Sequence, residues 1–116
     1  MQTLTRVYLG LGSNLDQPSE QIKTATTALS NHPDITFIAS SALYHSRPMG
    51  PQGQPDFVNV VIAIDTALEP HDLLDVCQAI EQAQGRERTR HWGPRTIDID
   101  IVLFGDAKID TLRLTI

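Results

Sequence analysis

Three stretches of this chain alternate between apolar and other residues with a period of two, and this alternation restricts the fold more than any other feature. They are RVYLGLG (residues 6–12), FVNVVIAID (57–65) and IDIDIVLF (97–104). Because successive side chains of a strand point to opposite faces of a sheet, each stretch predicts a strand with one apolar face. The three apolar faces are formed by Val7, Leu9 and Leu11; by Val58, Val60, Ile62 and Ile64; and by Ile97, Ile99, Ile101 and Leu103. The sequence therefore predicts a sheet that buries one face.

Two further stretches have the period of a helix. Pro18 suits a first helical turn, and Ile22, Ala25 and Leu29 then recur at helical spacing, which predicts a helix over 18–31. A second helix is predicted from Pro70 to about Gly85, because Gly85 is a plausible C-terminal stop. Its apolar stripe consists of Leu73, Leu74, Cys77 and Ile80.

One more strand is predicted for ITFIASSALY (35–44). The order strand, helix, strand, strand, helix, strand is that of the ferredoxin-like βαββαβ core, an α+β fold in which both helices cover one face of an antiparallel sheet. The stretches 45–56 and 85–96 are rich in Pro, Gly or Arg and are predicted to be long irregular loops.

Composition limits the class of protein. A length of 116 residues suits one domain, 1–116, and a net charge of −5 argues against nucleic acid and anionic membranes as partners. Cys77 is the single cysteine, and the N-terminus lacks the apolar core of a secretory signal, so we expect a cytoplasmic protein. We also expect a monomer.

The second face of the predicted sheet carries two carboxylates. Asp98 and Asp100 lie two residues apart, so their side chains leave the strand on one side, roughly 7 Å apart. A solvated sheet face would explain them equally well in isolation. However, Val102 and Phe104 continue the same face with apolar residues, so the acidic part is confined to one end of the strand. Two carboxylates that leave room for water and phosphate suit Mg²⁺.

The preceding loop supplies the opposite charge. Arg86, Arg88, Arg90 and Arg95 lie within ten positions, beside His91 and Trp92, in a chain with nine Lys and Arg residues in all. Clustered Arg favours bidentate binding of phosphate, although a flexible charged loop is the alternative. Together with the carboxylates, this cluster favours a nucleotide triphosphate as ligand. The chain has no G-x-x-x-x-G-K-[ST] loop, and GLGSNL lacks the third glycine of the dinucleotide motif.

Three segments resemble the 6-hydroxymethyl-7,8-dihydropterin pyrophosphokinase family. They are YLGLGSNL (8–15), SRPMGPQGQPDFVN (46–59) and, most specifically, WGPRTIDIDIVLFGD (92–106). The resemblance implies an enzyme of folate biosynthesis that transfers pyrophosphate from ATP to 6-hydroxymethyl-7,8-dihydropterin and releases AMP. It also implies that the loops 45–56 and 85–96 order over the substrates, and we expect both to be mobile without them.

The resemblance also implies roles for particular residues. Asp98 and Asp100 would bind two Mg²⁺ ions, and Arg86 and Arg95 would be catalytic. ATP would be bound by Gln78, Glu81, Arg88, Trp92, Arg95, Ile101, Arg113 and Thr115. The pterin would be bound by Gly12, Ser46, Arg47, Met49, Phe57, Asn59 and Trp92. The roles of Arg88 and Arg90 could be exchanged, and no residue stands out as a general base.

Other interpretations stay open at this point. Without the resemblance, Phe57 would be read as core filling, and Gln78 with Glu81 as an ordinary solvated helix face. Family members run on well beyond the position of Ile116, so we expect this chain to lack the usual C-terminal extension. A chain that binds substrates without turnover is one alternative. An RNA-binding ferredoxin-like module is another, although the RNP aromatic pattern is missing and the chain is acidic.

Overall fold

The computed structural model describes residues 3–13, 17–46, 57–85 and 97–106. The elements are β1 (Thr5–Ser13), α1 (Pro18–Ser30), β2 (Ile35–Ser40), β3 (Tyr44–Ser46), β4 (Phe57–Thr66), α2 (Pro70–Gly85) and β5 (Asp98–Phe104). Both helices begin at a proline, where the missing N–H would have had no partner within the helix. The predicted helices are therefore confirmed to within a residue of their expected ends.

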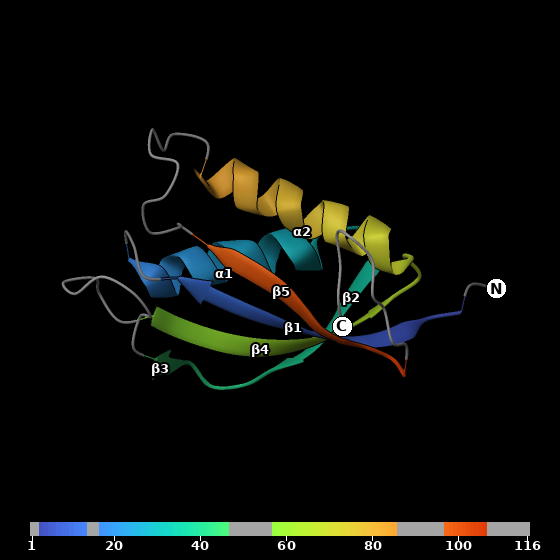
Figure 1. Cartoon of the computed structure of the whole chain (residues 1–116), viewed down its shortest axis with the longest axis horizontal. Coiled ribbons are helices and arrows are strands. Elements are labelled where there is room, and N and C mark those ends of the chain that lie inside the picture. The colour runs from blue at the N-terminus through green and yellow to red at the C-terminus, as the bar shows by residue number, and fades with distance from the viewer. Residues whose placement is uncertain (1–2, 14–16, 47–56, 86–96, 107–116) are drawn as a thin grey trace.

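The strands form one antiparallel sheet in the order β2-β4-β1-β5, and β3 also pairs with β4. The two helices lie on the same side of this sheet (Figure 1), where α1 contacts β1, β2 and β4, and α2 contacts β5 and α1. Residues far apart in sequence thus meet in the central strand β1, which lies between β4 and β5.

The core lies between the helices and one face of the sheet. Leu9 of β1 pairs with Ile62 of β4 on one side and with Ile101 of β5 on the other. All three side chains are buried, as are Leu73 and Cys77 of α2. The alternation of β4 is regular over its whole length, with every second residue buried from Val58 to Thr66. The apolar faces predicted for β1 and β4 are therefore confirmed.

The prediction for the end of β5 is wrong in register. Leu103 was expected on the buried face and Phe104 on the other, but Leu103 is 52% exposed and Phe104 only 7%. The reason is a bulge: Tyr8 pairs with Leu103 and Leu9 with Ile101, so Val102 is an extra residue in β5. One inserted residue moves every later side chain to the opposite face.

The predicted strand over 35–44 is also divided. β2 ends at Ser40, and residues 44–46 form the separate short strand β3, so His45 and Ser46 belong to a strand and not to the predicted loop. Between them, the Ser41 N–H donates to the carbonyl of Val61, and the Ser41 hydroxyl oxygen accepts the N–H of Val61 at 3.0 Å. This side chain replaces a ladder hydrogen bond where the edge strand is interrupted.

The described elements give an α+β fold, an antiparallel sheet with two helices, as the sequence predicts. Within the ranges that the structure describes, neither helix is long and apolar enough to cross a bilayer.

Candidate functional site

The candidate site begins with a row of residues that crosses the sheet. Gly12 of β1 pairs with Asn59 of β4 on one side and with Asp98 of β5 on the other, and Asn59 also pairs with Tyr44 of β3. Residues directly opposite in antiparallel strands project from the same face. Tyr44, Asn59 and Asp98 therefore share the face opposite the buried one, with a glycine between the amide and the carboxylate.

A second row lies next to the first. Gly10 pairs with Val61 on one side and with Asp100 on the other. Asp98 is partly exposed and Asp100 is exposed. Neither glycine contributes a side chain to this face, so the residues on β4 and β5 alone line it on either side of β1.

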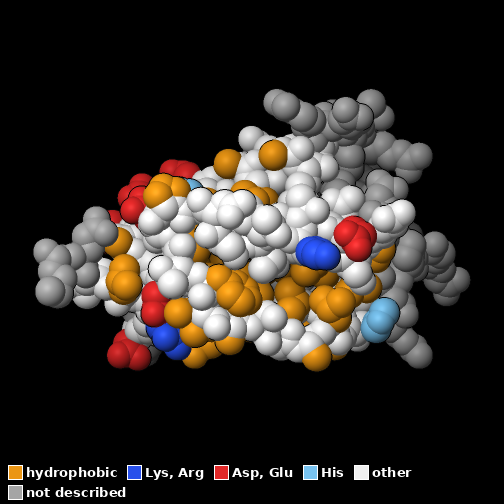
Figure 2. All heavy atoms as spheres, turned by 180° about the vertical axis from the view of Figure 1, so that it is seen from behind, with side chains coloured by type: hydrophobic (Ala, Val, Ile, Leu, Met, Phe, Trp, Pro, Cys, Tyr) orange, Lys and Arg blue, Asp and Glu red, His pale blue; other side chains and the backbone are white. Residues whose placement is uncertain are grey.

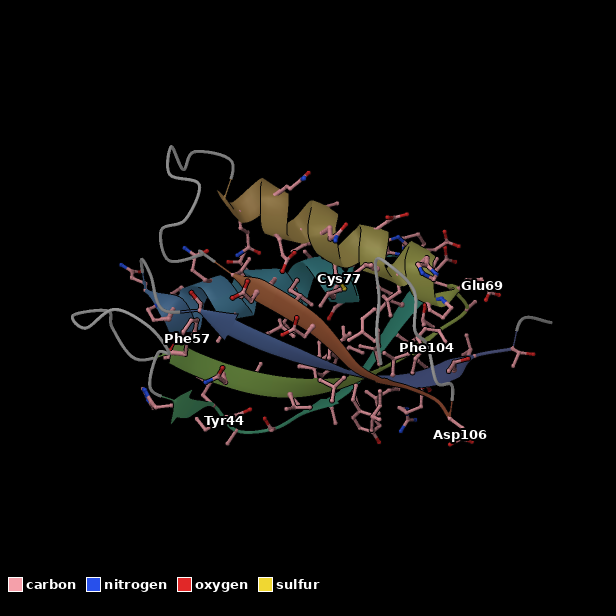
Figure 3. The ribbon with its side chains drawn as sticks, in the orientation of Figure 1. Tyr44, Phe57, Glu69, Cys77, Phe104 and Asp106 are labelled. Atoms are coloured by element: carbon pink, nitrogen blue, oxygen red, sulfur yellow. The ribbon has the colours of Figure 1, made fainter. Side chains whose placement is uncertain are left out.

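The side chains of Asn59 and Phe57 lean over Gly12. A Cβ atom placed on Gly12 would lie 2.9 Å from Oδ1 of Asn59 and 3.8 Å from Cδ1 of Phe57. Phe57 is partly buried and lies at the end of the sheet where β4 begins (Figure 3). An aromatic ring beside an amide could stack on a flat heterocycle and pair with its hydrogen-bonding edge.

The two carboxylates are suited to a hard divalent cation. Asp98 and Asp100 project from one face of β5, and within the described ranges no group of three or more His, Cys, Asp or Glu side chains could hold a metal. A pair of carboxylates is nevertheless sufficient for Mg²⁺, which commonly keeps several waters and takes further oxygens from substrate phosphates. These residues fit Mg²⁺ better than a metal that needs a complete protein cage.

Helix α2 contacts the strand that carries the carboxylates. The Ile99 N–H, which lies between Asp98 and Asp100, donates a hydrogen bond to Oε2 of Glu81 at 2.8 Å. Gln78, one turn earlier on the helix, is exposed. The side chain of Ile101 is buried on the core face, on the other side of β5 from the carboxylates.

Cys77 of α2 belongs to the core and is fully buried. Its side chain points from α2 toward the sheet (Figure 3). Burial, followed by the negative charges of Glu81 and Asp100, raises the pKa of the Cys77 thiol to about 12. The thiol is therefore protonated at neutral pH and acts as a small apolar core residue and not as a nucleophile.

Several predicted site residues lie outside the described residues. They are Arg47, Met49, Arg86, Arg88, Arg90, Trp92, Arg95, Arg113 and Thr115, together with most of the two predicted loops. Ser46 pairs with Phe57 through β3, which brings the start of the first of these segments to the Phe57 end of the sheet. The roles of these residues stay predictions.

Tyr44 is a residue of this face that sequence reasoning did not assign to the site. It is 49% exposed and lies opposite Asn59. The sequence signal was an aromatic residue two positions before the SRPMGPQGQPDFVN segment. The strand predicted over 35–44 does not show which of its residues pair with β4, so Tyr44 could not be placed opposite Asn59 from the sequence.

The chain also has a hollow of about 380 Å³, whose lining includes neither Asp98 nor Asp100. It lies between α1 and the sheet edge, and its walls include Ile22, Leu43 and Ile62, with Glu20 and Lys23 at its rim. Figure 2 shows the side of the molecule turned away in Figure 1, where hydrophobic side chains gather beside isolated charged ones. Because Ile22 and Ile62 belong to the core side of the sheet, this hollow is separate from the candidate site.

Comparison with known proteins gives consistent results over nearly the whole chain. Residues 8–116 match the family model described as 7,8-dihydro-6-hydroxymethylpterin-pyrophosphokinase (HPPK). A 2-amino-4-hydroxy-6-hydroxymethyldihydropteridine pyrophosphokinase of Pseudomonas aeruginosa is 53% identical over 97% of this chain and 70% of its own length. A protein of the same name from Haemophilus influenzae is 50% identical over 94% of this chain and 68% of its own length. Another from Pseudomonas putida is 51% identical over 96% of this chain and 92% of its own length.

Proposed function

Because the chain belongs to the HPPK family, and is thus an ATP-dependent diphosphokinase of pterin metabolism and folate biosynthesis, we propose that it forms the diphosphate of 6-hydroxymethyl-7,8-dihydropterin. The pterin hydroxyl oxygen would form a bond to the β-phosphorus of ATP. At the same time, the β-phosphorus would lose its bond to the oxygen that bridges it to the α-phosphorus. AMP leaves with that oxygen, and the hydroxyl proton passes to solvent. The products are AMP and the pterin diphosphate.

One observation carries this proposal: the amide and aromatic side chains share a sheet face with the two carboxylates. Asn59 and Asp98 are both paired with Gly12, so a group bound at Asn59 and Phe57 would lie one strand away from Asp98 and Asp100. A transfer between two bound substrates requires this proximity, because positioning the reactants accounts for much of the rate enhancement.

The carboxylates would hold Mg²⁺, two ions in the arrangement that the family resemblance implies. When bound, Mg²⁺ would neutralise negative charge on the ATP phosphates and so favour pyrophosphoryl transfer. The exposure of both carboxylates supports this assignment, since ATP must be able to reach them. Glu81 accepts a hydrogen bond from the N–H of Ile99, the residue between the two aspartates.

The pterin would bind over Gly12, between Phe57 and Asn59. The Phe57 ring would stack on the flat heterocycle, and the Asn59 amide would pair with its edge, which excludes water from that surface. Ser46, Arg47, Met49 and Trp92 complete the proposed pterin site. Gln78, Glu81, Arg88, Trp92, Arg95, Ile101, Arg113 and Thr115 complete the proposed ATP site, in which Arg86 and Arg95 would stabilise charge on the transferring group.

We further propose a ferredoxin-like core, with the substrate site on the face away from the helices, in one domain over residues 1–116. The sheet order β2-β4-β1-β5 and the regular burial along β4 support this arrangement. A monomer in the cytoplasm is proposed as well, supported by the single, buried cysteine.

The proposal is tested by AMP formation from ATP with Mg²⁺, measured with and without 6-hydroxymethyl-7,8-dihydropterin. We expect AMP to form only when both Mg²⁺ and the pterin are present, together with an equal amount of pterin diphosphate. AMP without pterin dependence, or a pterin monophosphate with ADP, would contradict the proposed reaction. Saturable pterin binding without any AMP would favour a chain that binds substrates without turnover.

A further inference from the structure

Among the strands that the structure describes, the one that carries the two carboxylates lies at the edge of the sheet. β5 is the last strand in the order β2-β4-β1-β5, and its partner there is β1. Along an edge strand, backbone N–H groups that point away from the partner strand need another acceptor or water. A group that accepts a hydrogen bond from these N–H groups of β5 also holds in place the backbone from which Asp98 and Asp100 project.

Glu81 supplies such an acceptor from a different layer. Its Oε2 accepts the hydrogen bond of the Ile99 N–H at 2.8 Å, although the two residues are 18 positions apart in the chain. Ile99 is itself paired with Leu11 of β1, and both of these side chains are buried. The segment Asp98–Asp100 is therefore bound to β1 along one edge and to α2 along the other.

A carboxylate is a strong acceptor for this purpose. A hydrogen bond to an ionised oxygen is about twice as strong as one between neutral groups, and this bond is partly buried. Twisting of a strand turns side chains two residues apart away from each other. A hydrogen bond that holds the Ile99 N–H in place limits this twist, and so it also limits the directions of the Asp98 and Asp100 carboxylates. A position on α2 can thereby influence a cation site without contacting the cation.

We propose that Glu81 is a positioning residue: through its hydrogen bond to the Ile99 N–H, it holds Asp98 and Asp100 in the arrangement that binds Mg²⁺. This inference rests on the proposed function, because that function assigns the cation to these carboxylates. This role is additional to the place of Glu81 in the proposed ATP site, since the bond engages the peptide between the two aspartates.

The test separates the hydrogen bond from the charge. Glu81→Gln keeps an acceptor oxygen and removes the charge, whereas Glu81→Met keeps the length of the side chain and removes both. Glu69→Met is the matched control, because Glu69 is exposed and lies immediately before Pro70, at the end of α2 away from Glu81 (Figure 3). Two quantities are measured by NMR: amide hydrogen exchange at Ile99, and the Kd for Mg²⁺ alone from the amide shifts of residues 98–100.

We expect Glu81→Met to accelerate exchange at Ile99 and to weaken Mg²⁺ binding, each by about tenfold or more. Glu81→Gln keeps a weaker, neutral acceptor and should lose less than Glu81→Met in both measurements, and Glu69→Met should change neither. If Glu81→Met does not fold, Glu81→Ala is measured in its place, with the same expectation.

Two results would overturn the inference. Wild-type Mg²⁺ binding in Glu81→Met would show that the hydrogen bond does not position the carboxylates. Equal loss in Glu81→Gln and Glu81→Met would show that Glu81 acts through its charge. Neither measurement requires turnover, so a wild-type chain that forms no pterin-dependent AMP would refute the proposed function separately.

Discussion

Gly12 of β1 and Asn59 of β4 face each other across the sheet so closely that a Cβ atom on Gly12 would lie 2.9 Å from Oδ1 of Asn59. The absence of a side chain at Gly12 therefore determines where the Asn59 amide can lie. Gly12 also pairs with Asp98, so the same glycine separates the proposed pterin site from the proposed cation site.

We expect Gly12→Ala to weaken pterin binding while leaving the protein folded. The new methyl group would displace the Asn59 amide, which is the flexible end of a side chain, so the displacement disturbs the site more than the fold. Isothermal titration with the pterin should show a Kd raised about tenfold, the equivalent of about 1.4 kcal/mol.

Gly10→Ala is the control for this substitution. It adds the same methyl group to the same strand, but this methyl group would lie 3.5 Å from Cγ2 of Val102, which is an ordinary van der Waals distance. Pterin affinity in Gly10→Ala should match the wild type. Equal effects of the two substitutions would mean that the glycines matter for backbone freedom and not for the position of Asn59.

Replacement of either aspartate should abolish Mg²⁺-dependent turnover. For Asp98→Asn and Asp100→Asn we expect kcat/KM to fall on the order of 100-fold or more, because each change removes charge where the transferring group is stabilised. AMP release over a range of Mg²⁺ concentrations measures this effect. Asp106→Asn, at the opposite end of the sheet from Phe57 (Figure 3), should retain wild-type activity. Full activity in the Asp98→Asn, Asp100→Asn double variant would refute the cation site.

The stability of the fold should decline at alkaline pH because of Cys77. Its pKa is about 12 in the folded chain against an ordinary value of 9.0, since burial disfavours the thiolate. Its contribution is fully present below about pH 9 and is lost as the pH rises toward 12, because the unfolded thiol ionises first. Between the two values, the free energy of unfolding should fall by up to about 1.4 kcal/mol per pH unit from this residue.

Urea unfolding of the wild type and of Cys77→Ala, measured from pH 8 to 11, would isolate this contribution. Both chains share the titration of Tyr and Lys, so the comparison concerns slopes and not absolute stability. The wild-type slope should be steeper above about pH 9. Parallel slopes would mean that the Cys77 thiol ionises as readily in the folded chain as in the unfolded one.

Thr66 closes the end of β4 through two hydrogen bonds. Its hydroxyl donates to the Asp34 carbonyl at 2.7 Å and accepts the Leu68 N–H at 3.1 Å, and the residue is fully buried. Thr66→Val keeps the shape but leaves both backbone groups without this partner, so we expect a loss of about 1–3 kcal/mol in the free energy of unfolding. Thr66→Ser keeps the hydroxyl and should lose less. A larger loss in Thr66→Ser than in Thr66→Val would indicate that the methyl group, and not the hydroxyl, is what stabilises this turn.

The sequence by itself determined the two helices, the strands β1, β4 and β5, and the shared face of Asp98 and Asp100. Alternation from Val58 to Ile64 predicted both the strand and its buried side, since a side chain in a strand has only two directions. Pro18 and Pro70 located the helix starts, since a proline at the first turn lacks only an N–H that would have had no helical partner. Asp98 and Asp100 were predicted to share a face because side chains two residues apart on a strand point the same way.

Only the tertiary structure decided register and edges. The extra residue Val102 reverses Leu103 and Phe104 because its place depends on how β5 pairs with Tyr8 and Leu9, which the local pattern of β5 does not contain. The pairing of Asn59 with Gly12, and the bond from Ile99 to Glu81, likewise join segments distant in sequence. A side chain's face follows from local geometry, whereas its neighbour across the sheet follows from how the whole chain packs.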